Sequence, residues 1–478
     1  MKLKTNISIA LYIFIFALFG LISSPLVNSP GTDSAVFFVM GRGIAAGKIM
    51  YKELFDHKGL YTYFLNYVAA LIDNRSTIGI FIVEFIFMFI SAKFVHASFS
   101  LYADERVSWL GTQIFIFFAF MRGILEGGNL TEEYALMFQV ISIYLLLRYI
   151  QDKHASPLYM FIHGINAGIV LFLRANLIMM WGGIAILVGY DLLKEKNFAG
   201  FGKNLAAGLL GLLAGVLPVI IYVVRTGSVS DAIFAIFTYN MSYINNGQSL
   251  LMRIVMTIFK LNYNTIILML AIIFSLILSF RRKYYILLLA LSVLSVSLSG
   301  RRYGHYYIYL VPFVMPVALK AALWINQHLR YKHAVIIVLA VSSIFCWKVR
   351  IVFNTIMFGS TQNSAYMEPF IEHNNKYYSE HEKVLVTGNS AGFYNRLGVI
   401  PHDKYFYVPA SNYETFPEPR NSQAESIISG VNDVIIITTP ENYFQETGKT
   451  EKINEVLSKN YELLYHDEKN NIFMYGRK

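Results

Sequence analysis

The sequence predicts an α-helical polytopic membrane protein that carries a small C-terminal α/β domain. Of its 478 residues, 55% are hydrophobic and only 15% are charged, and the mean hydropathy is +0.48. Soluble globular chains carry about 25% charged residues, so this composition indicates a bilayer. Residues 1–352 hold 29 Lys and Arg against 14 Asp and Glu, whereas residues 353–478 hold 11 against 16. We therefore divide the chain into a transmembrane domain, 1–352, and an extracytoplasmic domain, 353–478.

Eleven apolar segments are the predicted transmembrane helices, although several are shorter than the ~20 residues that cross a bilayer. They cover residues 7–27, 78–98, 107–120, 134–150, 158–173, 177–192, 205–224, 263–280, 284–298, 305–323 and 334–352. The first segment follows Lys2 and Lys4, and no small-residue cleavage site follows it, so we interpret it as a retained helix with a cytoplasmic N-terminus.

The apolar segment 60–72 decides the topology. It has only 13 residues and includes Asn66 and several tyrosines, so we expect a helix that lies on the membrane interface. With that placement, the loops predicted to be cytoplasmic carry eleven Lys and Arg against six in the outer loops other than the first, which carries five more but is too long for the rule to weigh. This bias favours a cytoplasmic membrane protein with its N-terminus inside and its C-terminal domain outside.

The C-terminal domain has the pattern of a soluble α/β fold. Segments 383–387 and 433–438 are short apolar runs followed by turn residues, which is typical of buried strands. Residues 449–459 have helical spacing, and the closing segments YELLYH and NIFMYG predict a hairpin around residues 468–471. About 125 residues of this kind can bury a core of their own.

Charged residues gather in the predicted outer loops, where folding can bring them to one outward-facing cavity. A carboxylate there can activate an acceptor, and cations can hold a phosphate leaving group. The acids are Asp33, Glu53, Asp56, Glu126, Glu132 and Glu133, and the bases are Lys58, Arg122, Arg174, Arg301 and Arg302. The basic residues are scattered between spans and form no stripe, so we expect no nucleic-acid partner.

The first outer loop, SPGTDSAVFFVMGRGIAAGKIMYKELFDHKGLYTYF at 29–64, resembles that of the GT-C glycosyltransferases, the superfamily of protein O-mannosyltransferases and lipid A aminoarabinose transferases. In that superfamily an acid is followed by a juxtamembrane helix ending in G-x-x-x-Y, and an acidic turn containing lysine opens a second interfacial helix. Asp33 matches the acid, residues 47–51 match G-x-x-x-Y, and residues 56–59 match the turn. The segments 127–136 and 299–312 resemble two further outer segments of the superfamily.

The resemblance implies transfer of one sugar from a polyprenyl-phosphate donor to an extracytoplasmic acceptor, with inversion at the sugar. The acceptor would be a cell-envelope glycan, lipid or protein. Asp33, Glu132 and Glu133 are the implied catalytic acids, with Asp33 as general base. The residues implied to bind the donor and its phosphate are Lys58, Arg174, Arg301, Arg302, Tyr303 and His305. The resemblance leaves open a divalent metal ion held by Asp56 and His57, and we expect no other cofactor.

Simpler structural roles exist for the same residues. Asp33 can cap a helix that starts near Ser34, and Glu132 and Glu133 can stabilise a helix N-terminus. Arg174 can extend to the interface from a helix end, and the segment around 301–309 can be an aromatic belt. Glu84, within a predicted span, is most simply a buried polar contact.

Two other functions remain open on the sequence alone. A polysaccharide polymerase or ligase is also polytopic, but such enzymes typically carry one large outer loop nearer the C-terminus. A lipid or sugar transporter tends to show internal repeats and acids at the membrane midplane. The acids of this chain lie mostly at the outer helix ends, which favours the glycosyltransferase.

Overall fold

The chain forms two compact units in the computed structural model, which describes residues 2–28, 31–121, 123–152, 156–244, 248–259, 263–279, 282–301, 303–329, 365–377, 383–409 and 413–478. Unit 1 comprises Met1–Ser24, Phe81–Tyr222 and Asn246–Val352, and unit 2 comprises Pro25–Ile80, Val223–Asn245 and Phe353–Lys478. The C-terminal segment that the sequence sets apart therefore packs in one unit with two segments of the preceding chain.

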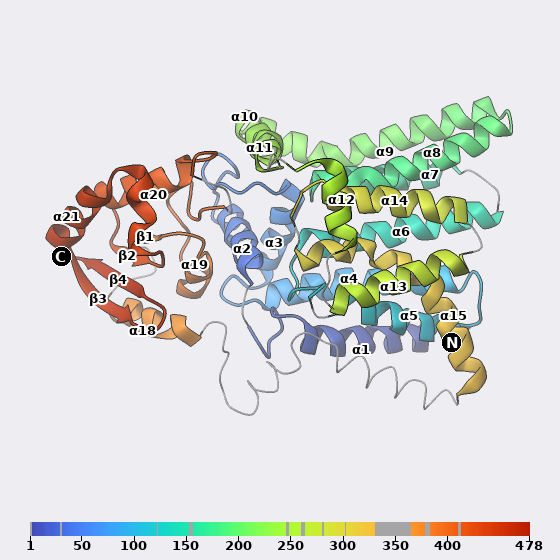
Figure 1. The fold of residues 1–478 in the computed structure, drawn as a ribbon, viewed down its shortest axis with the longest axis horizontal. Coiled ribbons are helices and arrows are strands. Elements are labelled where there is room, and N and C mark those ends of the chain that lie inside the picture. Colours follow the sequence, from blue (N-terminus) through green and yellow to red (C-terminus); the bar gives the residue numbers. More distant parts are fainter. Residues whose placement is uncertain are drawn as a thin grey trace. The chain divides into compact units, whose positions relative to one another are not determined.

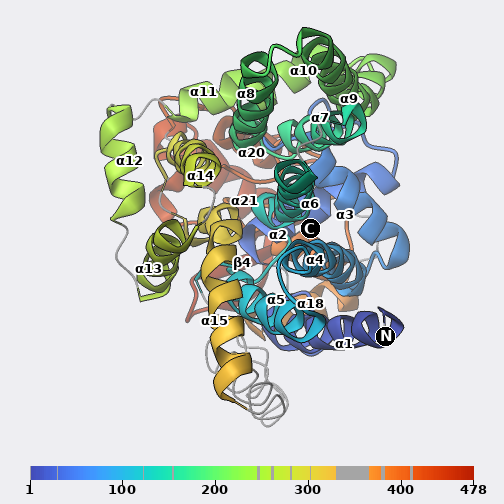
Figure 2. The same cartoon turned by 90° about the vertical axis from the view of Figure 1, so that its right-hand side faces the viewer.

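Most helices of unit 1 run alongside one another (Figure 1), and Figure 2 views several of these end on. The elements with residues in unit 1 are α1 (Lys2–Gly20), α4 (Ile78–Phe99), α5 (Glu105–Ala119), α6 (Thr131–Asp152), α7 (Pro157–Leu171), η1 (Ala175–Ile178), α8 (Met179–Lys194), α9 (Phe198–Arg225), α12 (Leu250–Ile258), α13 (Tyr263–Leu278), α14 (Arg282–Ser297), η3 (Gly304–Val314) and α15 (Met315–His328). Five helical stretches of the described residues are long and apolar enough to cross a bilayer, namely α4, α6, η1 with α8, α9, and η3 with α15. The chain is thus built as a multi-pass membrane protein.

The predicted apolar segments fall on these helices with ends that differ by a few residues. Segments 78–98 and 134–150, for example, correspond to α4 and α6. The eleventh segment, 334–352, lies outside the described residues, so the number of eleven spans stays a prediction. The segment 60–72 forms helix α3 (Leu60–Ile72) in unit 2, and its place on the membrane interface also stays a prediction.

Local sequence signals explain where several helices begin and how they pack. Asp104 caps α5 by accepting hydrogen bonds from the backbone N–H groups of Arg106 and Val107, each at 3.0 Å. Glycines allow α7 and α9 to approach closely, because a Cβ at Gly164 would lie 2.1 Å from the carbonyl oxygen of Gly208, and one at Gly211 would lie 2.0 Å from that of Phe161. Such small-residue contacts are typical of helix pairs in membranes.

Unit 2 begins with two helices of the first loop, α2 (Thr32–Ala45) and α3. Gly41 of α2 packs on the backbone of α3, where a Cβ would lie only 2.3 Å from the carbonyl carbon of Asn66. The segment after α9, to which the sequence assigned no element, contributes α10 (Val229–Ile233), the π-helical turn η2 (Phe234–Thr238) and α11 (Tyr239–Ile244). These elements are too short to give a clear periodic signal.

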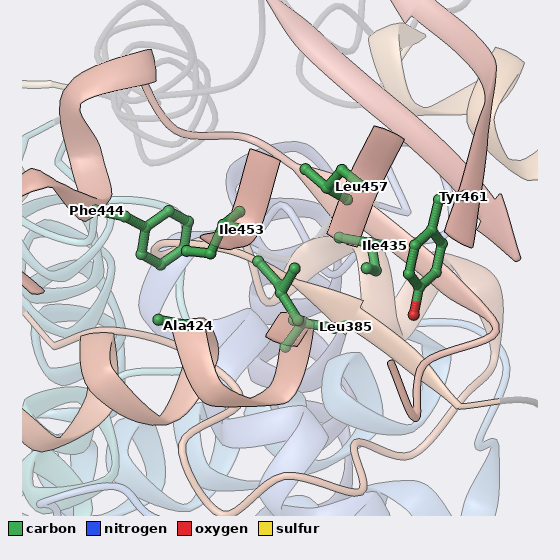
Figure 3. Packing of buried hydrophobic residues seen from close by; sticks show 8 residues of the cluster. Leu385, Ala424, Ile435, Phe444, Ile453, Leu457 and Tyr461 are labelled. Atoms are coloured by element: carbon green, nitrogen blue, oxygen red, sulfur yellow. The ribbon is translucent and has the colours of Figure 1, made fainter. Parts of the chain in front are cut away.

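The C-terminal part of unit 2 is a four-stranded sheet with helices, as the sequence predicts (Figure 1). Its strand order is β1 (Val384–Val386), β2 (Val434–Ile437), β4 (Ile472–Arg477) and β3 (Tyr461–Asp467); β1 and β2 are parallel, and the other pairs are antiparallel. The elements around the sheet are η4 (Ala365–Met367), α18 (Glu368–Tyr377), α19 (Gly392–Leu397), α20 (Glu418–Ile428), η5 (Glu441–Thr447) and α21 (Thr450–Asn460). Figure 3 shows the apolar core between the sheet and these helices, where Leu385 and Ile435 of the strands meet Ala424, Ile453 and Leu457. The predicted strands, the predicted helix 449–459 and the predicted hairpin are confirmed.

Candidate functional site

The carboxylate of Asp56 is the buried centre of a polar cluster in unit 2. The hydroxyl of Tyr63, from α3, donates to Asp56 Oδ2 at 2.8 Å, and the hydroxyl of Tyr407 donates to Oδ1. Burial alone would raise the pKa of Asp56. The charge of Lys58, together with His57 and the Tyr407 hydroxyl, outweighs burial and holds this pKa below its usual range. Asp56 is therefore a carboxylate at neutral pH.

The neighbouring His57 is held in one tautomer. The side-chain nitrogen of Asn240, in α11, donates to the carbonyl oxygens of His57 and Ile236, both at 2.8 Å, which fixes the orientation of the Asn240 amide. Its oxygen, 2.8 Å from His57 Nδ1, then accepts the ring proton, so Nε2 accepts from Lys58 Nζ at 3.1 Å. Burial and the adjacent Lys58 lower the pKa of His57 to about 4, so the imidazole is neutral at pH 7.

The metal interpretation of Asp56 and His57 does not fit this arrangement. Both carboxylate oxygens of Asp56 accept tyrosine hydroxyls, and both ring nitrogens of His57 are engaged by side chains. Among the described residues, moreover, there is no group of three or more His, Cys, Asp and Glu side chains that could hold a metal ion. We therefore treat the two residues as a hydrogen-bonded support of Lys58.

Asp33 lies at the start of α2 and is exposed. Gly31 is the N-cap of this helix, so Asp33 is the second helical residue and the capping role does not apply. Its charge acts on both His57 and Tyr407, which shows that Asp33 lies near the Asp56 cluster within unit 2. Lys58 Nζ lies 5.8 Å from the ring centre of Phe37, one turn further along α2. The first loop thus brings together Asp33, Asp56, His57 and Lys58.

Unit 1 contains a second charged cluster, at the N-terminal end of α6. Glu132 and Arg174 form an ion pair in which 2% and 13% of the side chains are exposed. The hydroxyl of Thr131 donates to the other oxygen of Glu132 at 2.8 Å, and the guanidinium of Arg174 lies 4.0 Å from the ring centre of Tyr306. A buried ion pair keeps its charges only where hydrogen bonds compensate for lost water, and here they do.

The segment 299–312 joins the same cluster through Glu126. This carboxylate accepts the backbone N–H of Gly304 at 2.8 Å and lies 2.6 Å from His305 Nδ1. The exposed ring of Tyr303 stacks on His305 with 10° between the ring planes. His305 also acts electrostatically on Glu132, so Glu126, Glu132, Arg174 and His305 form one site in unit 1.

The backbone between Glu126 and Thr131 is held by a buried acid from α4. Glu84 accepts hydrogen bonds from the Ser23 hydroxyl and from the backbone N–H of Asn129, and Glu133 is its electrostatic neighbour. Glu126 and Asn129 have positive φ angles of 50° and 54°, an uncommon conformation for residues other than glycine. Backbone strain of this kind concentrates at functional sites. Glu84 thus fills the structural role that the sequence suggested and also shapes the loop that carries Glu126.

Two further candidate residues, Arg301 and Arg302, are not among the residues that define the unit 1 cluster. Arg301 is partly exposed within the segment 299–312, and its backbone N–H donates to Ser299 Oγ at 3.3 Å. Arg302 lies outside the described residues. A cavity of about 550 Å³ lies elsewhere in unit 1, lined by residues such as Phe99, Ile150 and Lys320 from the C-terminal ends of α4 and α6 and from α15. It contains none of the candidate site residues.

Several residues of the two clusters were missed from the sequence. Glu126 counts among the outer-loop acids in the sequence but received no role in the site, because no catalytic motif surrounds it, although the glycines at 127 and 128 signal an unusual backbone. Tyr63 lies only seven residues from Asp56, but its segment was predicted as an interfacial helix without a role in the site. Asn240 and Tyr407 carry no local signal, because their partners in the first loop are 183 and 351 residues away. Only the folded chain identifies them.

The chain is similar in fold to solved membrane glycosyltransferases. ArnT from Cupriavidus metallidurans bound to undecaprenyl phosphate matches with a TM-score of 0.63 at 11% identity, over 99% of this chain and 97% of that chain. The apo form of the same ArnT matches with a TM-score of 0.63 at 12% identity, over the same shares of the two chains. The oligosaccharyltransferase AglB from Archaeoglobus fulgidus, in complex with an inhibitory peptide and a dolichol-phosphate, matches with a TM-score of 0.50 at 12% identity, over 100% of this chain and 74% of that chain. Both proteins are GT-C members, so the GT-C resemblance is confirmed at the level of the fold.

The family assignment rests on the sequence of the transmembrane part. No curated protein sequence matches the chain. A family model described as the putative competence-induced protein Ccs4 N-terminal domain matches residues 1–345, which is well over half of the chain. The chain therefore belongs to the family of putative competence-induced Ccs4 proteins.

Proposed function

We propose that this protein is a membrane glycosyltransferase that transfers one sugar from a polyprenyl-phosphate donor to an acceptor outside the cytoplasmic membrane. The observation that carries the proposal is a fold shared over nearly the whole length of both chains with ArnT, whose structure contains undecaprenyl phosphate. The charged groups of both units support it, since they are the types that such a reaction needs. The acceptor is a cell-envelope glycan, lipid or protein.

The phosphate of the donor is the proposed ligand of the basic residues. Arg174 offers a planar guanidinium already oriented by Glu132 and Tyr306, and Arg301 lies four residues before His305 in the segment 299–312. Guanidinium groups bind phosphate through paired, charge-assisted hydrogen bonds. Lys58 keeps the donor-binding role that the sequence resemblance implies for it, and the exposed Tyr303 ring offers a surface for the sugar. Arg302 keeps its proposed role from the sequence alone.

Asp33 is the proposed general base. Glu132 already neutralises Arg174, and Glu133 is buried beside Glu84, whereas Asp33 is exposed at a helix start. As the acceptor oxygen attacks the anomeric carbon, its proton moves to the Asp33 carboxylate. The bond from that carbon to the phosphate oxygen breaks, and polyprenyl phosphate leaves with the electron pair. One displacement inverts the anomeric centre, without a covalent bond between the sugar and the enzyme.

Binding of the carrier lipid tests the donor class. Undecaprenyl phosphate, added to the purified protein in detergent, should raise its thermal midpoint, and undecaprenol without the phosphate should do so far less. Arg174→Lys keeps the charge but loses the paired hydrogen bonds, so it should weaken this binding by roughly tenfold. Arg148→Lys, at the other end of α6 and paired with Asp152, is the matched control. Equal stabilisation by phosphate and alcohol would refute a phosphate-linked donor.

A further inference from the structure

A buried arginine of helix α2 forms hydrogen bonds to the C-terminal part of unit 2. Arg42, 5% exposed, donates from Nη1 to the carbonyl oxygens of Tyr394 and Val399, at 3.0 and 3.4 Å. In return, the side-chain nitrogen of Asn395 donates to the carbonyl oxygen of Ala35 at 2.9 Å. A buried guanidinium is costly unless its hydrogen bonds are made, so these contacts fix α19 against the helix that begins with Asp33.

A second set of contacts fixes the turn that follows. The backbone N–H of Phe55 donates to the carbonyl oxygen of Lys404 at 2.8 Å, and the Phe55 ring packs on those of Tyr405 and Phe416 at 5.2 and 5.4 Å. Lys404 also forms an ion pair of 2.8 Å with Asp231 of α10. Lys404, Tyr405 and Phe416 therefore hold the first loop one residue before Asp56.

Tyr407 completes this set, because its hydroxyl reaches the buried carboxylate itself. We infer that Tyr407 is a positioning residue for the transfer reaction: by holding Asp56 it sets the place of Lys58, and the C-terminal domain is thereby a working part of the donor site. The inference rests on the proposed function, since it assigns Lys58 to the donor. The inference gives the C-terminal domain a role in the reaction, which neither the sequence motifs nor the fold comparison supplies.

The Tyr407 hydroxyl matters because Asp56 is a buried carboxylate that depends on a small number of hydrogen-bond donors. Each of its two oxygens accepts a tyrosine hydroxyl, and the backbone N–H of His57 also donates to the carboxylate, so loss of the Tyr407 hydroxyl leaves a buried charge with one donor fewer. The charge of Asp56 acts on Lys58 and on His57. The Lys58 ammonium in turn donates a hydrogen bond to Nε2 of the neutral His57. The titratable groups that face this cluster from its neighbouring elements are Asp33, Tyr51, Tyr63, Tyr239 and Tyr407. Loss of the Tyr407 hydrogen bond should therefore affect Lys58 through the attraction between the charges of Asp56 and Lys58.

The test compares Tyr407→Phe with Tyr405→Phe in the full-length protein. Each variant removes one hydroxyl, from positions two residues apart in the same segment, but only the hydroxyl of Tyr407 donates to Asp56. Loss of a hydrogen bond to a charged group should raise the KM for the polyprenyl-phosphate sugar roughly tenfold or more in Tyr407→Phe, with kcat changed much less. The acid limb of kcat/KM should move to higher pH, because a carboxylate with fewer donors is protonated more easily. Tyr405→Phe should match the wild type in each measurement.

A measurement without donor keeps the inference independent of the proposed function. Lys58 of the purified protein is acylated with a water-soluble ester, and the modified peptide is quantified by mass spectrometry. Tyr407→Phe should increase the acylation rate of Lys58 several-fold over both the wild type and Tyr405→Phe. Unchanged acylation together with an unchanged KM would overturn the inference. A wild-type protein that transfers no sugar would instead refute the proposed function, while altered Lys58 acylation would still support the hold of Tyr407 on the loop.

Discussion

His57 lies in the first loop with 13% of its side chain exposed, and its pKa is lowered to about 4 by burial and by Lys58. An unfolded chain has an ordinary histidine pKa near 6.5, so between pH 6.5 and 4 the unfolded state binds a proton that the folded state does not. Stability is thus complete above pH 6.5 and falls as the pH drops towards 4, by up to about 3 kcal/mol. Asp56, with a lowered pKa, loses its contribution only below this window.

Thermal midpoints measured across this window check the expectation. The midpoint of the wild type should fall between pH 6.5 and 4, and His57→Gln should flatten the fall. His328→Gln, at an exposed position in unit 1, is the control and should leave the slope as it is. A His57→Gln slope equal to that of the wild type would show that the imidazole is not buried in its neutral form.

The ion pair of Glu132 and Arg174 makes a second prediction at this scale. Removing one partner leaves a buried charge, so Arg174→Ala should destabilise unit 1 by about 3–5 kcal/mol. The double variant with Glu132→Gln should recover part of this loss, because the carboxylate is then absent. The exposed pair of Arg148 and Asp152 should contribute only about 0–1 kcal/mol, as read from Arg148→Ala. If the destabilisation by Arg174→Ala and that by Glu132→Gln simply add in the double variant, the ion pair between these two residues is contradicted.

Sequence reasoning could identify these residues only in part. Asp33, Asp56, His57 and Lys58 stand close together in the chain, within a recognisable loop, so their grouping could be predicted. The contact between Tyr407 and Asp56 joins positions 351 residues apart and leaves no trace in either segment. The metal interpretation of Asp56 and His57 could not take account of the Tyr407 hydroxyl on the carboxylate, because that donor comes from a distant segment.

The helices could be predicted better than the site because hydropathy is a local signal over some twenty residues. Short elements such as α11 and η2 lack that signal and were missed.

The close contact between helices α7 and α9 depends on glycine, which allows a test by substitution. Gly211→Ala would place a Cβ 2.0 Å from the carbonyl oxygen of Phe161, so it should lower the thermal midpoint. Gly202→Ala, in the same helix with nothing within 4 Å of its Cβ, should leave it unchanged or slightly higher. Equal effects of the two substitutions would refute the close α7–α9 contact.

The orientation of the whole chain in the membrane is a prediction from its charge distribution. We expect the C-terminal domain outside and residues 281–283 inside. Single cysteines introduced at the exposed positions Glu468 and Lys283, in a Cys346→Ser background, should differ in intact cells towards an impermeant maleimide. Labelling at 468 but not at 283 agrees with the predicted orientation, and the reverse pattern contradicts it.

The most direct test of the account is sugar transfer by the purified protein in liposomes, from a polyprenyl-phosphate sugar to cell-envelope acceptors, with Asp33→Asn beside the wild type. A positioned general base contributes ~10²–10⁴-fold, so the variant should lose at least about a hundredfold of turnover. Because Asp33 is exposed and does not cap α2, its thermal midpoint should stay close to that of the wild type. A well-folded Asp33→Asn that keeps more than about a tenth of wild-type turnover, against the loss expected for a base, would contradict the proposed mechanism.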